Sequence, residues 1–457
     1  MNLIDKILSR MHLSETKQKV VRNLFWAVTG KVVTLLGSLL VGIFVARYLG
    51  PEQYGLMNYV VSFVALFQVF ASFGLDNIEI REESKCKGTG EKGRVPGVEA
   101  NTILGTAFGL RLIFAGITML LVILTAWIFE ADTFTKWMIT LYSLSMIMNT
   151  FGVIRNYFTS IVWNEYIVKT EINRTLIGAL IKVALLLLHA PLAWFIAATL
   201  FDTFLIAGGY LLSYRKKIAS LRLWTFDLPT AKYLIKESLP VLLSGAAVVF
   251  YQRIDQLMIG NMIDNESVGY YSVAGSFIAI LGFIPSVLSQ TITPILVQLF
   301  VSNREQYKHQ AQLFMNVTIW LCVLMCIAVC LCAYPLIRYT YGIQYLPAVP
   351  ILQVAVFREV FLAQAQVTGS MILSEHIQKS VAWRNIIGCV VCIGLNLLLI
   401  PRYGVMGAAW VSILTALFTG FVSHLIIPTY RHIFRMQCRS FLIGWKDIVH
   451  LKSILKS

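Results

Sequence analysis

The chain has 457 residues, of which 57% are hydrophobic and 13% are charged, and its mean hydropathy is +0.72. This composition excludes an ordinary soluble domain. A formal net charge of +15 would suggest nucleic-acid binding in a soluble protein. Here the basic residues alternate with long apolar segments, so nucleic acid is not needed to explain them.

Twelve hydrophobic segments follow one another, each long enough to cross about 30 Å of hydrocarbon as a helix. We predict spans near residues 21–46, 56–80, 101–129, 137–161, 169–189, 191–213, 236–260, 268–300, 311–337, 345–372, 383–400 and 404–428. Pro285 and Pro294 lie in the eighth segment, and a break at either would change the count. The polar, basic residues 1–20 lack the apolar core of a signal peptide, so we expect the first spanning helix to direct insertion.

The basic residues predict the orientation of the chain. With a cytoplasmic N-terminus, 28 Lys and Arg residues fall in cytoplasmic segments, whereas four fall outside, namely Arg47, Lys136, Arg338 and Arg402. Positively charged segments remain preferentially in the cytoplasm. We therefore predict a multi-pass protein of the cytoplasmic (inner) membrane with both termini in the cytoplasm.

The two halves of the chain resemble each other in sequence. The matched segments are residues 52–78 with 266–292, at an offset of 214, and residues 165–198 with 375–408, at an offset of 210. Charged, Gly and Pro positions carry the match, for example Gly55 with Gly269 and Arg174 with Arg384. Two homologous halves around a midplane site are typical of secondary transporters. Six helices per half is an even number, so we expect a pseudo-twofold axis along the membrane normal.

These observations predict an all-α polytopic membrane protein. About twelve transmembrane helices would form two pseudo-twofold-related six-helix bundles around a central cavity. The predicted segments are an N-terminal bundle (1–213), a cytoplasmic linker (214–235), a C-terminal bundle (236–429) and a basic cytoplasmic or interfacial tail (430–457). In the tail, Phe441, Trp445, Ile448 and Leu455 can share one helical face, which predicts a helix lying in the interface. A disordered basic tail is the alternative.

Motifs for enzymatic chemistry are missing from the sequence. Gly88–Gly93 fits G-x-G-x-x-G, but this segment lies in a charged loop with no preceding strand, so a flexible loop is the better interpretation. There is no P-loop, and the seven His residues lack metal-ligand spacing. We predict no catalytic residue, no metal site and no cofactor, and therefore a protein that is not an enzyme.

Charged residues inside the predicted spans are the candidates for function. Six are cations: Lys31, Arg111, Arg174, Lys182, Arg253 and Arg358. At the centre of a lipid-facing helix each would cost about 2.5–3.5 kcal/mol, so most must face an interior cavity or extend to an interface. Arg111 lies about ten residues into the third helix, near the midplane, and is the foremost candidate. We predict that the six cations bind substrate, although Arg174 can also reach the interface and pair with Glu171.

Four carboxylates accompany these cations: Asp76, Asp202, Asp255 and Glu359. We predict that they couple transport to an ion or balance charge. Adjacent helical residues point about 100° apart, so Arg358 and Glu359 are not expected to form a simple pair. The excess of cations suits an anionic substrate such as a phosphate or pyrophosphate. Asn58, Ser62, Ser72 and Asp76 follow helical spacing on the second predicted helix, as expected of a helix that lines a wet cavity.

Two motifs resemble a known family. Arg47-Tyr-Leu-Gly-Pro-Glu-Gln-Tyr-Gly55 resembles the signature of polysaccharide biosynthesis flippases, the O-antigen repeat-unit flippase family of the multidrug/oligosaccharidyl-lipid/polysaccharide (MOP) exporter superfamily. Asn396-Leu-Leu-Leu-Ile-Pro-Arg-Tyr-Gly-Val-Met-Gly-Ala-Ala409 fits the same family, and the resemblance covers nearly the whole chain. It implies a flippase that translocates an undecaprenyl-pyrophosphate-linked oligosaccharide repeat unit through a cationic lumen by alternating access. The implied partners are this anionic lipid-linked oligosaccharide, membrane lipids and a glycan polymerase or glycosyltransferases, with no nucleic acid.

Three alternatives remain open. A multidrug exporter of the same superfamily would need buried carboxylates for cationic drugs, and here the buried cations outnumber the acids. A polytopic glycan polymerase or ligase would be expected to present a sizeable external loop, whereas the longest predicted outside connection is the short one around residues 334–345. A flippase for the peptidoglycan precursor typically has additional C-terminal helices.

Overall fold

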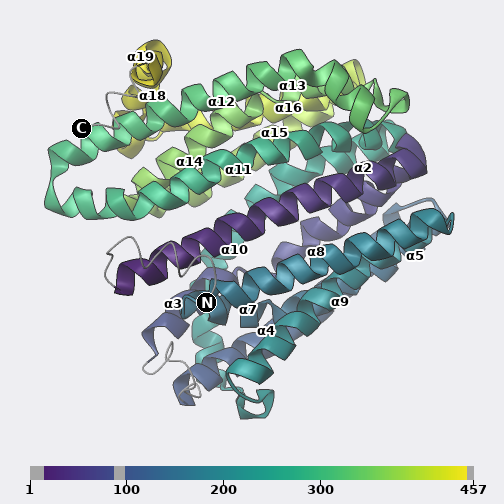
Figure 1. The fold of residues 1–457 in the computed structure, drawn as a ribbon, viewed down its shortest axis with the longest axis horizontal. Coiled ribbons are helices and arrows are strands. Elements are labelled where there is room, and N and C mark those ends of the chain that lie inside the picture. Colours follow the sequence, from purple (N-terminus) through teal and green to yellow (C-terminus); the bar gives the residue numbers. More distant parts are fainter. Residues whose placement is uncertain (1–14, 87–97, 450–457) are drawn as a thin grey trace. The chain divides into compact units, whose positions relative to one another are not determined.

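The computed structural model describes residues 15–86 and 98–449, and every regular element within these ranges is helical (Figure 1). The predicted all-α fold is confirmed. The Gly88–Gly93 segment, residues 1–14 and Leu455 lie outside the described ranges. The longer helices are α2 (Glu15–Ser72), α3 (Leu75–Lys85), α4 (Val98–Phe129), α5 (Thr133–Ser143), α7 (Gly152–Ser160), α8 (Asn164–Leu187), α9 (Leu192–Lys217), α10 (Leu228–Met262), α11 (Asn265–Ser302), α12 (Arg304–Thr340), α13 (Ala348–Ala355), α14 (Arg358–Ser374), α15 (Val381–Tyr403), α16 (Val405–Leu417) and α18 (Arg431–Ile443).

Short helical elements complete this order. They are α6 (Ser145–Met148), η2 (Asn149–Phe151), η3 (Leu221–Leu223), η4 (Ile343–Tyr345), η5 (Gln378–Ser380), the π-helical η6 (Phe418–Val422), α17 (Ser423–Ile426), η7 (Pro428–Tyr430) and α19 (Trp445–Val449).

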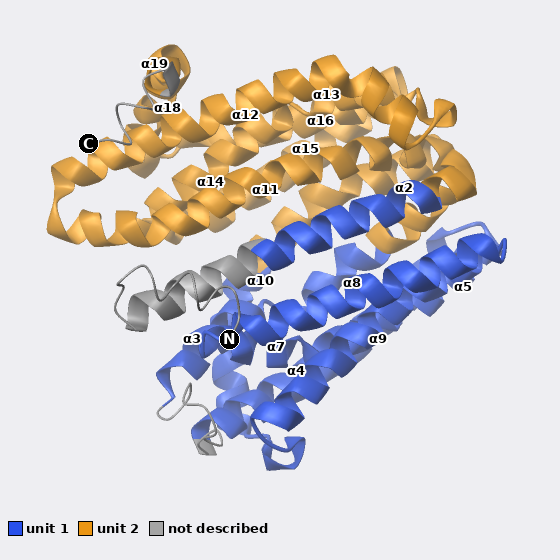
Figure 2. Cartoon of the chain, viewed as in Figure 1, with its two compact units in different colours: residues 1–45, 63–242 blue, residues 46–62, 243–457 orange. Residues whose placement is uncertain are grey.

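The chain divides into two compact units, coloured blue and orange in Figure 2. Unit 1 is Met1–Val45 with Phe63–Leu242, and unit 2 is Ala46–Ser62 with Leu243–Ser457. The end of the first predicted span and the start of the second therefore pack with the second half of the chain. The long helices α2 and α10 each contribute residues to both units.

Ten helices of the described chain are long and apolar enough to cross a membrane. One of them, Thr29–Lys85, is long enough to cross twice. The helix α8 is not among the ten because Glu171, Arg174 and Lys182 interrupt its apolar stretch. Counting the first twice and adding α8 gives the twelve spans that the sequence predicts. The eighth span is not broken, because α11 continues through both Pro285 and Pro294.

Two backbone breaks divide the first long helical stretch. At the first, Gly50 has a φ of 74° and Pro51 begins the next turn, and such a φ is readily adopted only by glycine. At the second, Phe73 and Gly74 have φ values of 51° and 67°, and α3 begins at Leu75. The predicted continuous second helix is therefore wrong: Asp76 lies on α3, beyond a break that separates it from Asn58, Ser62 and Ser72.

Two further predicted spans are also broken. The fourth consists of α5, α6, η2 and α7 in succession, and the tenth consists of α13 and α14, which are separated at Val356 and Phe357. Arg358 and Glu359 consequently occupy the first turn of a new helix, where the backbone before them is not a regular α-helix.

The family-like segment that ends at Gly55 packs within unit 2. A Cβ on Gly55 would collide with the carbonyl oxygen of Asn265, and a Cβ on Gly269 would collide with that of Pro51. Asn265 and Gly269 are the repeat equivalents of Pro51 and Gly55, so the two contacts are reciprocal, as contacts across a twofold axis are. Arg47 Nη2 also donates to the carbonyl of Tyr339 at 2.6 Å. The motif therefore has a packing role.

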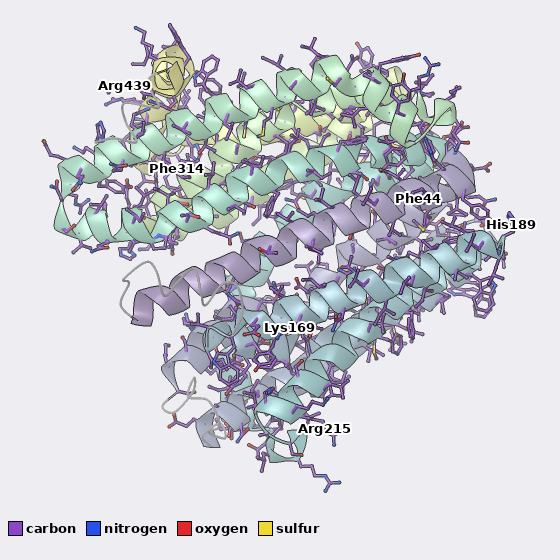
Figure 3. All side chains as sticks on the ribbon, viewed as in Figure 1. Phe44, Lys169, His189, Arg215, Phe314 and Arg439 are labelled. Atoms are coloured by element: carbon purple, nitrogen blue, oxygen red, sulfur yellow. The ribbon has the colours of Figure 1, made fainter. Side chains whose placement is uncertain are left out.

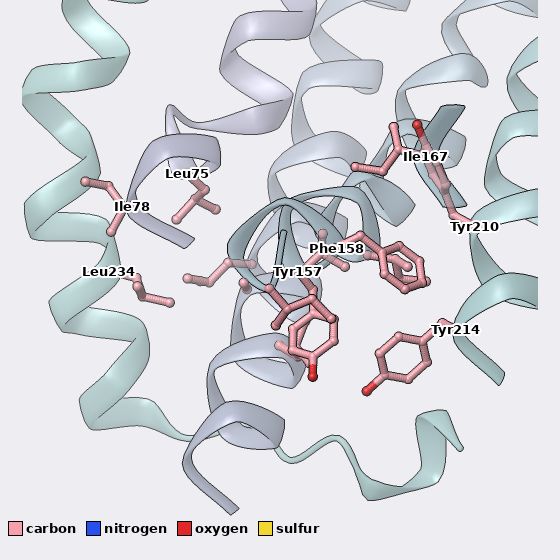
Figure 4. Close-up of a cluster of buried hydrophobic side chains, with 14 of the residues drawn as sticks. Leu75, Ile78, Tyr157, Phe158, Ile167, Tyr210, Tyr214 and Leu234 are labelled. Carbon is pink, nitrogen blue, oxygen red and sulfur yellow. The ribbon is translucent and has the colours of Figure 1, made fainter. Parts of the chain in front are cut away.

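A hydrophobic cluster forms the core of unit 1 (Figure 4). Side chains from α3, α4, α7, α8, α9 and α10 contribute, and the labelled ones are Leu75, Ile78, Tyr157, Phe158, Ile167, Tyr210, Tyr214 and Leu234. Neighbouring positions on the same helices carry Asp76, Glu79, Arg111 and Asn156. Burial of this core therefore holds α3, α4 and α7 together, and with them the polar side chains described next.

The described part of the tail packs on unit 2. The ring of Phe441 lies 6.4 Å from that of Phe361 and 5.7 Å from that of Phe421. Trp445 is 47% exposed and begins a separate helix after Gly444. Gly444 keeps helical backbone angles (φ −64°, ψ −20°), so the single helical face expected for Phe441 and Trp445 stays a prediction.

Candidate functional site

Arg111, the foremost candidate, is 4% exposed in the middle of α4 and is bound by two carboxylates of α3. Its Nε donates to Glu79 Oε1 at 2.6 Å, and its Nη2 donates to Glu79 Oε2 at 3.0 Å and to Asp76 Oδ1 at 2.7 Å. Asn156, on α7, donates from Nδ2 to Asp76 Oδ1 at 3.0 Å and to Glu79 Oε2 at 2.6 Å. The guanidinium charge is thus already matched within unit 1.

The acidic side of this cluster is larger than the sequence predicted. Glu79 and Glu83 are both fully buried on α3, and neither was among the four predicted buried acids. Glu83 was missed because the second span was expected to end near residue 80, and Glu79, at that expected end, was not counted among the charges inside the spans. The break at Phe73 and Gly74 instead turns α3 toward α4. Glu79 and Glu83 add two buried acids to the four that the sequence predicted. The excess of cations over acids inside the apolar segments is therefore smaller than predicted.

Lys182 and Asp202 form a second pair in unit 1. Lys182 Nζ, on α8, lies 2.6 Å from Asp202 Oδ2, on α9, and both side chains are largely buried. Gly178, one turn before Lys182, lets Asp202 approach, since a Cβ there would collide with the carboxylate. This contact is a charge balance across helices, one of the two roles predicted for Asp202.

Arg174 has a different environment from the other cations of unit 1. It lines a pocket of about 500 Å³ between α8 and α9, together with Lys169, Lys216 and Lys217, and the lining residues include no carboxylate. Lys169 is labelled on α8 in Figure 3 and is bound to Glu165 at 2.6 Å. Glu171 lies 3.8 Å from Arg155 rather than in a pair with Arg174. The predicted Arg174–Glu171 pair is therefore not formed among the described residues.

Asp255 is the most enclosed candidate of unit 2, at 2% exposure on α10. Its Oδ2 accepts a hydrogen bond from Tyr271 Oη at 2.7 Å, and its Oδ1 accepts one from Asn396 Nδ2 at 2.7 Å. Cys392 Sγ lies 3.6 Å from the same Oδ1. Neutral donors from α11 and α15 thus surround this carboxylate.

Arg358 and Glu359 lie beside this group on α14. Arg358 Nε and Glu359 Oε1 are 3.8 Å apart, so the expectation that adjacent residues would not pair is wrong. Arg358 also interacts electrostatically with Asp255 and Tyr271. The structure therefore brings Asp255, Arg358 and Glu359 into one charged group.

Lys31 and Arg253 are placed elsewhere, and both are exposed. Arg384 lies near the start of α15, and its Nη1 is 3.2 Å from His424 Nε2. Because arginine only donates, His424 accepts at Nε2 and donates from Nδ1 to Gln437 Oε1 at 3.1 Å. The equivalence of Arg384 with Arg174 in the repeat was the signal that could have identified it.

The chain matches the family model described as polysaccharide biosynthesis protein over residues 44–350, about two thirds of its length. The chain belongs to this family. The match includes the signature-like segment that ends at Gly55, so the resemblance proposed from that segment is confirmed. No curated protein matches the sequence of this chain.

Solved transporter structures share the fold of this family member. The lipid II flippase MurJ, in an inward closed conformation, is similar over 94% of this chain and 93% of the MurJ chain (TM-score 0.64, 13% identity). An inward-facing multidrug resistance MATE family transporter of the MOP superfamily matches 92% with 96% of its own (TM-score 0.60, 16% identity). A MOP superfamily transporter from Pyrococcus furiosus matches 96% with 97% of its own (TM-score 0.57, 16% identity). The family member is thus a multi-pass membrane protein with a MOP transporter fold.

Proposed function

We propose that this protein is a flippase that translocates an undecaprenyl-pyrophosphate-linked oligosaccharide repeat unit across the cytoplasmic membrane by alternating access. The observation that carries the proposal is a polysaccharide biosynthesis family match on a MOP transporter fold. A membrane transporter in such a family has an amphiphilic intermediate as its natural cargo. The pyrophosphate of that cargo is an anion that Arg and Lys bind well.

Arg111 is the proposed pyrophosphate-binding residue of the transport cycle. In the present arrangement Asp76 and Glu79 accept hydrogen bonds from Nε and Nη2 of Arg111. A pyrophosphate that takes this Nε and Nη2 side of the guanidinium displaces at least one carboxylate, and a proton or another cation then compensates the released charge. We propose Asp255 as a residue that couples the cycle to an ion, because it is nearly completely buried and its hydrogen bonds come from the neutral groups of Tyr271 and Asn396, with Arg358 nearby.

A genetic experiment tests the proposed function. The gene is deleted, and surface glycan is measured together with lipid-linked oligosaccharide on the cytoplasmic side. Loss of glycan, accumulation of the intermediate and rescue by the wild-type gene are the expected results. Intact surface glycan in the deletion strain would overturn the proposal.

A multidrug exporter is the second candidate, and the carboxylates of α3 favour it. The buried Glu79 and Glu83 and the more exposed Asp76 lie near Arg111, and this excess of carboxylates suits a cationic drug. The Pyrococcus furiosus relative is described as having a binding pocket of reverse polarity that suggests a different function. New sensitivity to cationic dyes in the deletion strain, with normal glycan, would favour the exporter.

A further inference from the structure

The pocket between α8 and α9 has more positive charge than its own contacts neutralise. Of its four cations, Lys169 is paired with Glu165, whereas Arg174, Lys216 and Lys217 form no ion pair among the described residues. Lys217 Nζ lies 6.0 Å from the ring centre of Tyr166, which leaves its charge available. The pocket therefore presents about three uncompensated positive charges around a space that can hold a small anion.

Arg174 carries the second observation. Its Nε is fully buried and has no hydrogen-bond partner. The two Nη nitrogens are not enclosed in this way and form no hydrogen bond among the described residues, so they are the donors that a ligand in the pocket can reach. The planar guanidinium matches the oxygens of a phosphate group.

The remaining lining residues select for a lipid rather than a free ion. Ile177, Phe204 and Leu212 line the same pocket and are 42%, 42% and 57% exposed. Asn173 and Ser213 add neutral hydrogen-bonding groups. A surface with cations beside exposed apolar side chains is complementary to a headgroup with its hydrocarbon chain. The sequence-based orientation places Lys216 and Lys217 on the cytoplasmic side, where anionic lipids are bound by basic pockets between helices.

The equivalent arginine of the second repeat has different surroundings from Arg174. Arg384 occupies the equivalent position on α15, where His424 lies 3.2 Å from its Nη1. Trp383 stands where the first repeat has Asn173 and is 68% exposed. The two arginines differ in that His424 contacts Arg384, whereas Arg174 forms no hydrogen bond among the described residues.

We propose that the α8–α9 pocket binds the phosphate-bearing headgroup of a membrane lipid, with Arg174 contacting the phosphate and the chain lying along Ile177, Phe204 and Leu212. The lipid is either an abundant anionic glycerophospholipid or a polyprenyl pyrophosphate, which share this chemistry. The proposal goes beyond the proposed function, because binding at this pocket requires no transport.

Native mass spectrometry on the purified full chain tests the proposal, with phosphatidylglycerol, undecaprenyl pyrophosphate and inorganic pyrophosphate as separate probes. Arg174→Gln removes the phosphate contact, and Gly208→Leu fills the pocket, since a Cβ at Gly208 meets no atom within 4 Å. Arg215→Gln is the matched charge control, because Arg215 precedes Lys216 but does not line the pocket. Gly116→Leu is the matched control for bulk, because its Cβ is also unobstructed.

We expect Arg174→Gln and Gly208→Leu to weaken lipid binding by at least about tenfold, as expected for loss of a hydrogen bond to a charged group. Neither control should change it. Tighter binding of phosphatidylglycerol identifies a glycerophospholipid site, and tighter binding of undecaprenyl pyrophosphate identifies a carrier-lipid site. Both results support the proposal. Unchanged binding of both lipids to stably folded Arg174→Gln protein, or equal binding of inorganic pyrophosphate, would overturn it.

Discussion

Arg111 and Arg174 are both arginines of spanning helices in unit 1, but their surroundings differ. Arg111 is enclosed by two carboxylates and an amide, whereas Arg174 shares a pocket with three lysines. The energetic consequences differ as well. Removing one partner of a buried charge pair leaves the other charge uncompensated, whereas removing one of several like charges relieves repulsion. The comparison teaches that a charged residue in an apolar segment can hold the fold together or remain available to a ligand.

The largest effect is expected for Arg111. Arg111→Ala leaves Asp76 and Glu79 without their cation, which should cost about 3–5 kcal/mol of stability and abolish surface-glycan display. Arg111→Lys should retain part of the stability and part of the glycan display, because lysine keeps the positive charge. The measurements are thermal unfolding of the purified protein and glycan display in the deletion strain. Normal display by a stably expressed Arg111→Ala variant would refute the substrate-binding prediction.

A double variant separates folding from binding at this site. Arg111→Gln with Glu79→Gln removes one charge of each sign, so it should recover much of the stability lost in Arg111→Gln. If Arg111 binds substrate, glycan display stays absent in the double variant. Recovery of display together with stability would instead make Arg111 a charge-balancing residue.

The Lys182–Asp202 pair should contribute to stability in the same way as the ion pairs of Arg111, because each charge is neutralised by its partner. Lys182→Met leaves Asp202 buried without a cation and should destabilise the protein by about 3 kcal/mol or more. Adding Asp202→Leu should restore most of that loss, because both charges are then removed. Thermal unfolding of the two single variants and the double variant checks this. Equal melting temperatures for Lys182→Met and the wild type would show that the pair contributes as little to stability as an exposed surface ion pair.

Arg174 provides the opposite test of the comparison. We expect Arg174→Gln to change stability by no more than about 0.5 kcal/mol, because no described ion pair is lost. Its effect should fall on lipid binding instead. A melting temperature lowered as much as that of Arg111→Ala would show that the pocket is structural and would remove the contrast between the two arginines.

The smallest effect is expected outside the spanning helices, at His432. Its Nε2 lies 2.8 Å from Glu375 Oε2, and this hydrogen bond raises the pKa of His432 above its usual value. A raised pKa in the folded state stabilises the protein fully below about pH 6.5, the unfolded value, and this contribution disappears as the pH rises through the folded value. We expect at most about 1 kcal/mol for this half-exposed pair. The melting temperatures of the wild type and His432→Gln should differ most at acidic pH, and a difference that grows with pH would contradict the assignment.

The fold class was predictable because the membrane imposes it. Apolar segments of fixed length and a repeated pattern of Gly, Pro and charged residues predict twelve helices in two related halves. The reciprocal contacts of Gly55 and Gly269 are consistent with that repeat. The breaks at Phe73 and Gly74 and before Arg358 were not predicted, since both lie in segments whose hydropathy is uninterrupted.

The sequence by itself determined that this is a multi-pass membrane protein, how its helices repeat and which charged residues lie within its apolar segments. The hydropathy of a segment and the residue matches between the two repeats depend on the order of residues alone, so they can be identified without knowledge of tertiary contacts. Only the tertiary structure decided which charges neutralise each other. Glu79 reaches Arg111 because α3 turns after a break, and Arg174 stays open because Glu171 lies beside Arg155 instead. Charge pairing depends on distances of a few ångström between different helices, and that geometry is set by packing.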